Sequence, residues 1–142
     1  MIDETDRKIL KMLQENARTS NAEIARSIGM APSAVLERIR RLERKGVLQA
    51  YESRIDPLSL GLDLTTFIMV RPEEPVGTFE TGKKLAHIPE VQEIHYIAGD
   101  YCYICKVRVS GTESLGELLK KLGSFPEVRD TRTTLVLRSI KD

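Results

Sequence analysis

The residues best suited to chemistry lie in one short run, 31–45, which is strongly basic. Its charged residues are Glu37, Arg38, Arg40, Arg41, Glu43, Arg44 and Lys45. Several guanidinium groups on one helix suit contacts to phosphates and to base edges in a major groove. A plain solvated helix face, with its arginines paired to nearby glutamates, would have the same composition. Nucleic-acid binding and a solvated surface are therefore the two readings of this run.

A second candidate is Cys102-Tyr103-Ile104-Cys105, which has the spacing of a dithiol or metal motif. Its residue types favour a strand, in which residues three apart point to opposite faces, so the two thiols would not meet. These are the only cysteines, and no second pair completes a metal site. His87 and His95 each lie in a predicted element without a ligand partner nearby. We therefore predict structural roles for all four residues, no metal and no cofactor.

The elements that must position the basic run are three short helices in the first fifty residues. Apolar residues at helical spacing follow the acidic start 3–6, and 20–23 has the spacing of a capping box. Gly29 ends the second helix, Pro32 begins the third and Gly46 ends that one. Two helices joined by a tight turn, the second of them basic, predict a helix-turn-helix.

One face of the third helix is left for DNA if Val35, Ile39 and Leu42 turn inward. The first residues of such a helix enter the major groove, and later arginines reach bases or phosphates. The predicted contacts are Ser33, Ala34 and Arg38 to base edges, Glu37 on the same face, Arg40, Arg41 and Arg44 to bases or phosphates, and Arg18 and Arg26 to the backbone.

The remaining chain predicts an α+β fold of two domains. Residues 1–50 form the helix-turn-helix domain, and a strand pattern lies at 47–51. Residues 51–61 form a hinge strand and linker, and residues 62–142 form a second domain. That domain has strand patterns at 62–70, 91–98, 101–109 and 128–140, and helix patterns at 78–88 and 112–122. The order βαββαβ is that of the ferredoxin-like unit. Because the first strand is apolar on both faces, we expect the uncovered sheet face to pack on a second subunit.

Composition excludes several classes of protein. The chain is 41% hydrophobic and 30% charged, which is typical of a globular protein, and its net charge of +1 makes the basic signal local. No apolar run approaches the roughly 20 residues that span a bilayer. The start Met1-Ile2-Asp3-Glu4 is too acidic for a signal peptide, so we expect a cytoplasmic protein without a membrane partner.

These motifs resemble the Lrp/AsnC (leucine-responsive, feast/famine) family of transcriptional regulators over essentially the whole chain. The matching stretches are Asp3-x-x-Asp6-x-x-Ile9-Leu10, Glu23-Ile24-Ala25, Pro32-Ser33, the L-E-R-x-R-R-L-E run at 36–43, Gly46-Val47-Leu48, Gly99-Asp100-Tyr101 and 130–133. The resemblance implies a winged helix-turn-helix, a hinge strand and a ferredoxin-like ligand domain. It also implies a sequence-specific regulator, not an enzyme, that binds double-stranded DNA as a homodimer or as a tetramer of dimers (octamer). Ala31 stands where the family often has Ser, so we expect a weaker side-chain cap there.

The resemblance further implies an amino-acid-like effector bound between dimers. The implied lining is Gly99, Asp100, Tyr101, Cys102, Tyr103, Thr131 and Thr133. Cys102 stands where the family typically has Asp, and a neutral thiol is a poor partner for a desolvated ammonium group. We therefore predict weak or no binding of common amino acids. The same Thr and Tyr residues are equally compatible with ordinary strand packing.

Two other functions remain open at this point. Sirohaem decarboxylases resemble the family in fold, and His95 lies near the turn where such a site would form. A free-standing amino-acid-binding module is the other alternative, although it would not need the first fifty residues.

Overall fold

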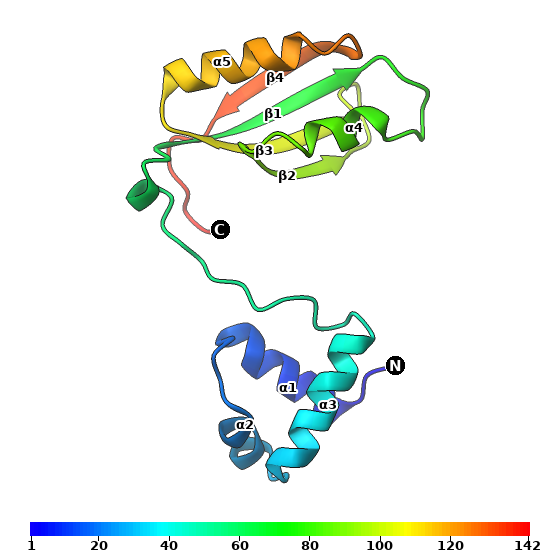
Figure 1. Ribbon diagram of the computed structural model, residues 1–142, viewed down its shortest axis with the longest axis vertical. Helices are drawn as coiled ribbons and strands as arrows, with labels where there is room; N and C mark the ends of the chain where they lie inside the picture. Colours follow the sequence, from blue (N-terminus) through cyan, green and yellow to red (C-terminus); the bar gives the residue numbers. More distant parts are fainter. The chain divides into compact units, whose positions relative to one another are not determined.

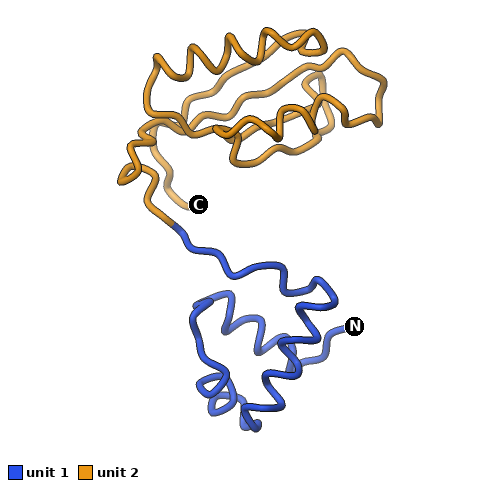
Figure 2. The backbone as a smooth tube through the Cα atoms, in the orientation of Figure 1, with its two compact units in different colours: residues 1–54 blue, residues 55–142 orange.

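The computed structural model describes all 142 residues and divides into two compact units, 1–54 and 55–142 (Figure 2). Each unit has a hydrophobic core of its own. No helix in the chain combines the length and the apolar character needed to cross a bilayer.

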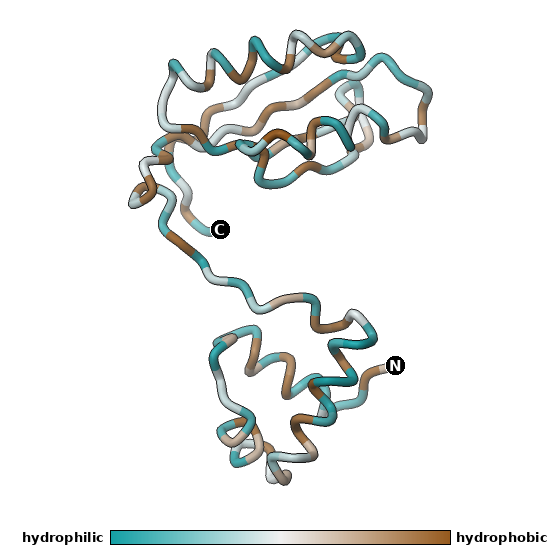
Figure 3. Tube along the Cα trace, viewed as in Figure 1, coloured by the Kyte–Doolittle hydropathy of each residue, from teal (hydrophilic) through white to brown (hydrophobic).

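Unit 1 is a bundle of three helices (Figure 1), and the second of them begins and ends at the residues that the local sequence predicts. They are α1 (Glu4–Glu15), α2 (Asn21–Ile28) and α3 (Pro32–Arg44). Ser20 and Glu23 form the expected capping box at α2, and Gly29 ends that helix with a φ of 70°. Ala31 provides no side-chain cap for α3, as expected. Apolar residues recur along all three helices (Figure 3), and their inward members form the core, namely Ile9, Leu13, Ile24, Ala25, Val35 and Ile39.

The strand predicted at 47–51 is absent. Residues 49–56 have no regular structure and pair with no strand, because unit 1 contains no other strand to accept their hydrogen bonds. Leu48 packs against the helical core, while Val47 and Tyr51 are exposed. The Tyr51 hydroxyl donates to Glu43 at 2.7 Å, so the segment lies close to the end of α3.

Unit 2 is the predicted βαββαβ unit, preceded by a short 3₁₀ turn, η1 (Leu58–Leu60). Its elements are β1 (Leu64–Pro72), α4 (Glu80–Leu85), β2 (Val91–Tyr96), β3 (Tyr103–Val109), α5 (Thr112–Gly123) and β4 (Val128–Leu135). The strands form one antiparallel sheet in the order β2-β3-β1-β4, and α4 and α5 cover one of its faces (Figure 1).

Four of these elements are shorter than predicted. β2 ends at Tyr96 instead of 98. β4 ends at Leu135, opposite Thr66 of β1, and not at Ile140; beyond it only the Val136 N–H donates to the Thr65 carbonyl, at 2.9 Å. α4 spans only 80–85, and β3 begins at 103 instead of 101. The late start of β3 moves Tyr101 out of the strand, with consequences for its side chain described below.

The two faces of the sheet differ in what covers them. The helix-covered face of β1 and β3 carries Ile68, Val70, Cys105 and Val107, all buried. Phe67 on β1 points the other way and is half-buried, as are Met69 and Ile104. The prediction of apolar residues on both faces of the first strand is therefore confirmed.

Candidate functional site

The outer face of α3 holds part of the predicted DNA-contacting set. Ser33, Glu37, Arg40 and Arg44 are exposed along this helix, and Ala34 is half-buried in its first turn. The only ion pair on this face joins Arg44 to Glu37 at 3.8 Å, and both side chains remain largely exposed. Such a pair is worth little in water, so both groups are available to a ligand. Arg18 and Arg26 are also exposed, outside α3.

Two of the predicted contacts, Arg38 and Arg41, lie elsewhere than expected. We expected Arg41 to point away from the bundle, but both arginines turn toward the start of α1. The Arg38 Nη1 donates to Asp3 Oδ2 at 2.7 Å and to Asp6 Oδ1 at 3.0 Å. The Arg41 Nη2 donates to both carboxylate oxygens of Asp6 at 3.1 Å. The side chains of Arg38 and Arg41 are 25% and 40% exposed.

The two carboxylates are fixed by the start of α1. The Asp6 N–H donates to Asp3 Oδ1 at 2.8 Å and the Asp3 N–H donates to Asp6 Oδ2 at 3.1 Å, which is a reciprocal capping box. Asp6 is 1% exposed, so its carboxylate is buried, while the two arginine side chains that bind it remain partly exposed. The hydrogen bonds from Arg38 and from the Asp6 N–H lower the pKa of Asp3 to about 2. Sequence reasoning noted both aspartates as helix starters but missed their pairing with α3.

The residues predicted to line a ligand site divide between the two faces of the sheet. Thr131 and Thr133 pair in register with Val70 and Ile68, so they share the helix-covered face, where Tyr103 is also buried. Gly99 has a φ of 142° in the turn after β2, and Asp100 beside it is exposed. This positive φ favours glycine at the position.

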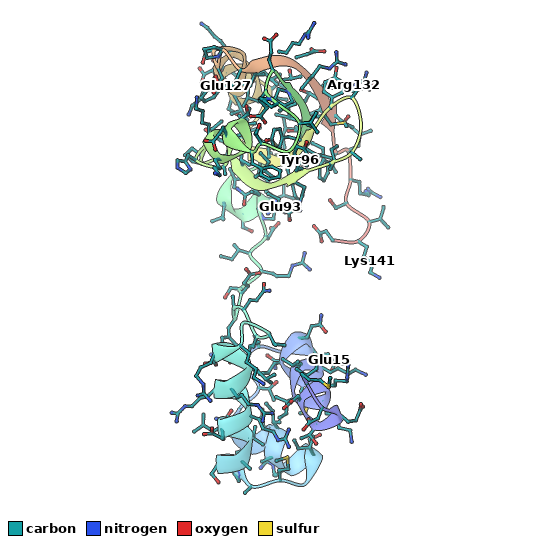
Figure 4. The ribbon with its side chains drawn as sticks, turned by 90° about the vertical axis from the view of Figure 1, so that its right-hand side faces the viewer. Glu15, Glu93, Tyr96, Glu127, Arg132 and Lys141 are labelled. Atoms are coloured by element: carbon teal, nitrogen blue, oxygen red, sulfur yellow. The ribbon has the colours of Figure 1, made fainter.

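Tyr101 belongs to the other face, where two arginines enclose its ring. The guanidinium carbons of Arg71 and Arg132 lie 4.8 Å and 5.0 Å from the ring centroid. The hydroxyl donates to Asp130 Oδ2 at 2.8 Å, and this bond raises the pKa of Tyr101. Figure 4 labels Arg132 on β4 and Tyr96 on β2, the two edge strands of the sheet. The strand pattern predicted at 101–109 would put Tyr101 on the same face as Cys105, but Tyr101 precedes β3 and its ring lies on the other face.

Tyr103 is held under α4 by a carboxylate and by a close backbone approach. Its hydroxyl donates to Glu74 Oε1 at 2.7 Å, while the other Glu74 oxygen accepts from the N–H and hydroxyl of Thr81 at 3.0 and 2.8 Å. Burial and the Glu74 bond raise the pKa of Tyr103 to about 12. Gly82 lies directly on the ring, with Tyr96 packed edge-on from another side. Glu74 and Gly82 were missed, because neither forms a recognisable motif with Tyr103.

The two cysteines occupy different surroundings. Cys105 is buried in the core, and burial raises the pKa of its thiol to about 11. Cys102 is half-buried at the margin of the same core. His95 is exposed, and its Nε2 lies 3.3 Å from Oε2 of Glu93. The structure contains no group of three or more His, Cys, Asp or Glu side chains arranged to hold a metal ion.

Comparison with known proteins assigns both units. A family model described as winged helix-turn-helix DNA-binding matches residues 2–49, and one described as Lrp/AsnC ligand binding domain matches residues 65–142. The HTH-type transcriptional regulator FL11 of Pyrococcus horikoshii is 37% identical over 142 residues, covering 99% of this chain and 93% of that protein.

Two similar solved structures contain L-methionine. The feast or famine regulatory protein of Mycobacterium tuberculosis in that complex has a TM-score of 0.93 and 34% identity, covering 100% of this chain and 96% of the other. A transcriptional regulator of Neisseria meningitidis, also with L-methionine, has a TM-score of 0.92 and 30% identity, covering 100% and 94%.

The fold, the exposed basic helix and these matches define a DNA-binding transcriptional regulator with a separate ligand-binding domain. The relatives are named as regulators and not as enzymes, so the decarboxylase alternative finds no support among them. The free-standing ligand module is excluded by the helix-turn-helix match to unit 1. The chain belongs to the Lrp/AsnC family.

Proposed function

We propose that this regulator reads duplex DNA as a homodimer, with the exposed row Ser33, Glu37, Arg40 and Arg44 of α3 in the major groove. The observation that carries the proposal is this row itself. It lies on α3, the second helix of the helix-turn-helix, where it faces away from the bundle and has no partner from α1. The half-buried Ala34 lies at the edge of the row. Arg18 and Arg26 supply phosphate contacts from outside α3. Such a protein would act in the cytoplasm.

Arg40→Ala tests the DNA surface, with Lys11→Ala as its control. Both residues are exposed cations of unit 1, but Lys11 lies on α1. We expect Arg40→Ala to weaken binding and to lower the salt slope by about one if it contacts phosphate, while Lys11→Ala changes neither. If Arg40 contacts a base, its replacement lowers the binding free energy for the operator by about 1–3 kcal/mol and changes the affinity for random DNA little. Equal behaviour of the two variants would remove Arg40 from the interface.

The homodimer is supported by the uncovered sheet face and by the exposed apolar residues of the segment after α3, which has no regular structure. Phe67, Met69 and Ile104 lie on that face, and Tyr51 and Ile55 are exposed in residues 49–56. Apolar groups left open in this way are typical of subunit contacts. Sedimentation equilibrium should give at least twice the chain mass of 16.0 kDa, and eight times that mass for a tetramer of dimers. DNase footprints should then show dyad symmetry, whereas a bound monomer would contradict the proposal.

Unit 2 is proposed to bind a small effector around the turn 99–103, with Thr131 and Thr133 contributing. Support comes from the ligand-domain match and from the relatives solved with L-methionine. Cys102 is half-buried and carries no charge for an ammonium group, while the exposed Asp100 is the nearest carboxylate along the chain. We therefore propose that common amino acids bind weakly. Calorimetric titration with the twenty amino acids checks this, and tight binding of any of them would contradict it.

A further inference from the structure

The charge on α3 is divided between arginines that face solvent and arginines that are bound to carboxylates of α1. Arg40 and Arg44 are exposed, but Arg38 and Arg41 are held by two carboxylates of α1. We infer that Asp3 and Asp6 take the place of DNA phosphates on Arg38 and Arg41, and so lower the affinity for DNA of any sequence. Binding then depends more strongly on the residues that read bases.

The geometry of the contacts supports substitution for phosphate. Guanidinium groups prefer planar, paired oxygen acceptors, and carboxylates and phosphates both provide them. Arg41 reaches both oxygens of Asp6 through one nitrogen, and Arg38 bridges Asp3 and Asp6. Both guanidinium-bearing side chains nevertheless remain partly exposed, so an arginine released from its acid would face solvent.

The acids are held more firmly than the arginines. Asp6 is almost fully buried, and the capping box ties both carboxylates to the backbone of α1. An arginine that moved to a phosphate would leave the buried Asp6 carboxylate without one of its two charged partners, which costs free energy. The two acids and two cations also cancel in net charge, so this group adds little to the attraction toward a duplex. Because sequence-independent binding scales with the number of phosphates neutralised, it is this component that the acids reduce.

Asp3→Asn is the decisive variant, and Glu4→Gln is its matched control. Asn caps a helix about as well as Asp, so α1 keeps its start while Arg38 loses one charged partner. Glu4 lies in the same first turn, is exposed, and has no arginine contact, yet its replacement changes the net charge equally. Circular dichroism on both full-length variants would show that the helices are retained.

The measurement is binding to a selected operator and to a random-sequence duplex across a salt series. For Asp3→Asn we expect about threefold to tenfold tighter binding to the random duplex, a salt slope steeper by about one, and a smaller operator-to-random ratio. Glu4→Gln should keep the wild-type slope and ratio. The double variant Asp3→Asn/Arg38→Gln should return to the wild-type slope, because the released cation is gone.

Two results would overturn the inference. One is a salt slope of Asp3→Asn that equals that of Glu4→Gln. The other is weaker random-duplex binding by Asp3→Asn, which would mean that the acids only orient α3. The inference rests on the proposal that α3 lies against the duplex, and Arg40→Ala in the same assay tests that proposal separately. If Arg40→Ala weakens binding while Asp3→Asn behaves like its control, only the phosphate-substitution inference fails.

Discussion

Gly82→Ala is expected to destabilise unit 2, although the same change usually stabilises a helix. A Cβ at position 82 would lie 2.6 Å from Cε1 and 3.0 Å from Cζ of the Tyr103 ring. The ring cannot retreat easily, because it is 2% exposed, Tyr96 packs edge-on against it at a centroid distance of 5.5 Å, and its hydroxyl donates to Glu74. The added methyl group therefore forces either α4 or Tyr103 out of place.

The net effect follows from two opposing contributions. Overpacking a filled site costs typically about 1–3 kcal/mol, while replacing Gly by Ala in a helix gains up to about 1 kcal/mol. We expect the free energy of unfolding to fall by about 1 kcal/mol. Gly116→Ala in α5 is the matched control, since it makes the same change in a helix where nothing lies within 4 Å of the new Cβ. It should raise the free energy of unfolding by roughly 1 kcal/mol.

Urea unfolding followed by circular dichroism measures both variants. Opposite shifts of the midpoint, with similar slopes, are the expected result. If Gly82→Ala raises the midpoint as Gly116→Ala does, the close approach of α4 to Tyr103 is not a constraint, and the account of how this tyrosine is held is refuted.

Three further predictions concern individual groups. Hydrogen bonds from Arg38 and from the Asp6 N–H lower the pKa of Asp3 from 3.8 to about 2 in the folded chain. The ionised Asp3 therefore stabilises the fold fully above pH 3.8, and this contribution is lost as the pH falls through about 2. Asp3→Asn should flatten the acid unfolding curve in that window, and an unchanged curve would contradict the pairing. A thiol reagent at pH 8 should label Cys102 in the native protein but Cys105 only after unfolding, because burial raises the pKa of Cys105 to about 11; two equally fast thiols would refute this. Cys102→Asp should strengthen amino-acid binding tenfold or more in calorimetry, since a charge-assisted hydrogen bond is worth about 1.5–3 kcal/mol, and no gain would make Cys102 a packing residue only.

Local sequence was sufficient for the helices of unit 1 and for the order of elements in unit 2. Ser20 with Glu23, Gly29 and Pro32 act within a few residues of themselves, so their types alone mark where α2 and α3 begin and end. Alternating and helical spacing likewise predicted βαββαβ, because the apolar period follows directly from backbone geometry. The outward placement of Glu37 and Arg44 came from the same helical period.

Pairings between distant residues were decided only by the tertiary structure. Arg38 and Arg41 differ from Arg40 not in type but in meeting Asp3 and Asp6, more than thirty residues earlier in the chain. Tyr101 leaves the face of Cys105 because β3 begins two residues late, and the strand expected at 47–51 is missing because no neighbouring strand pairs with it. Periodicity predicts which way a side chain points from its own element. Which partner it finds there depends on how the elements pack, and that is why the division of charge on α3 was visible only in the folded chain.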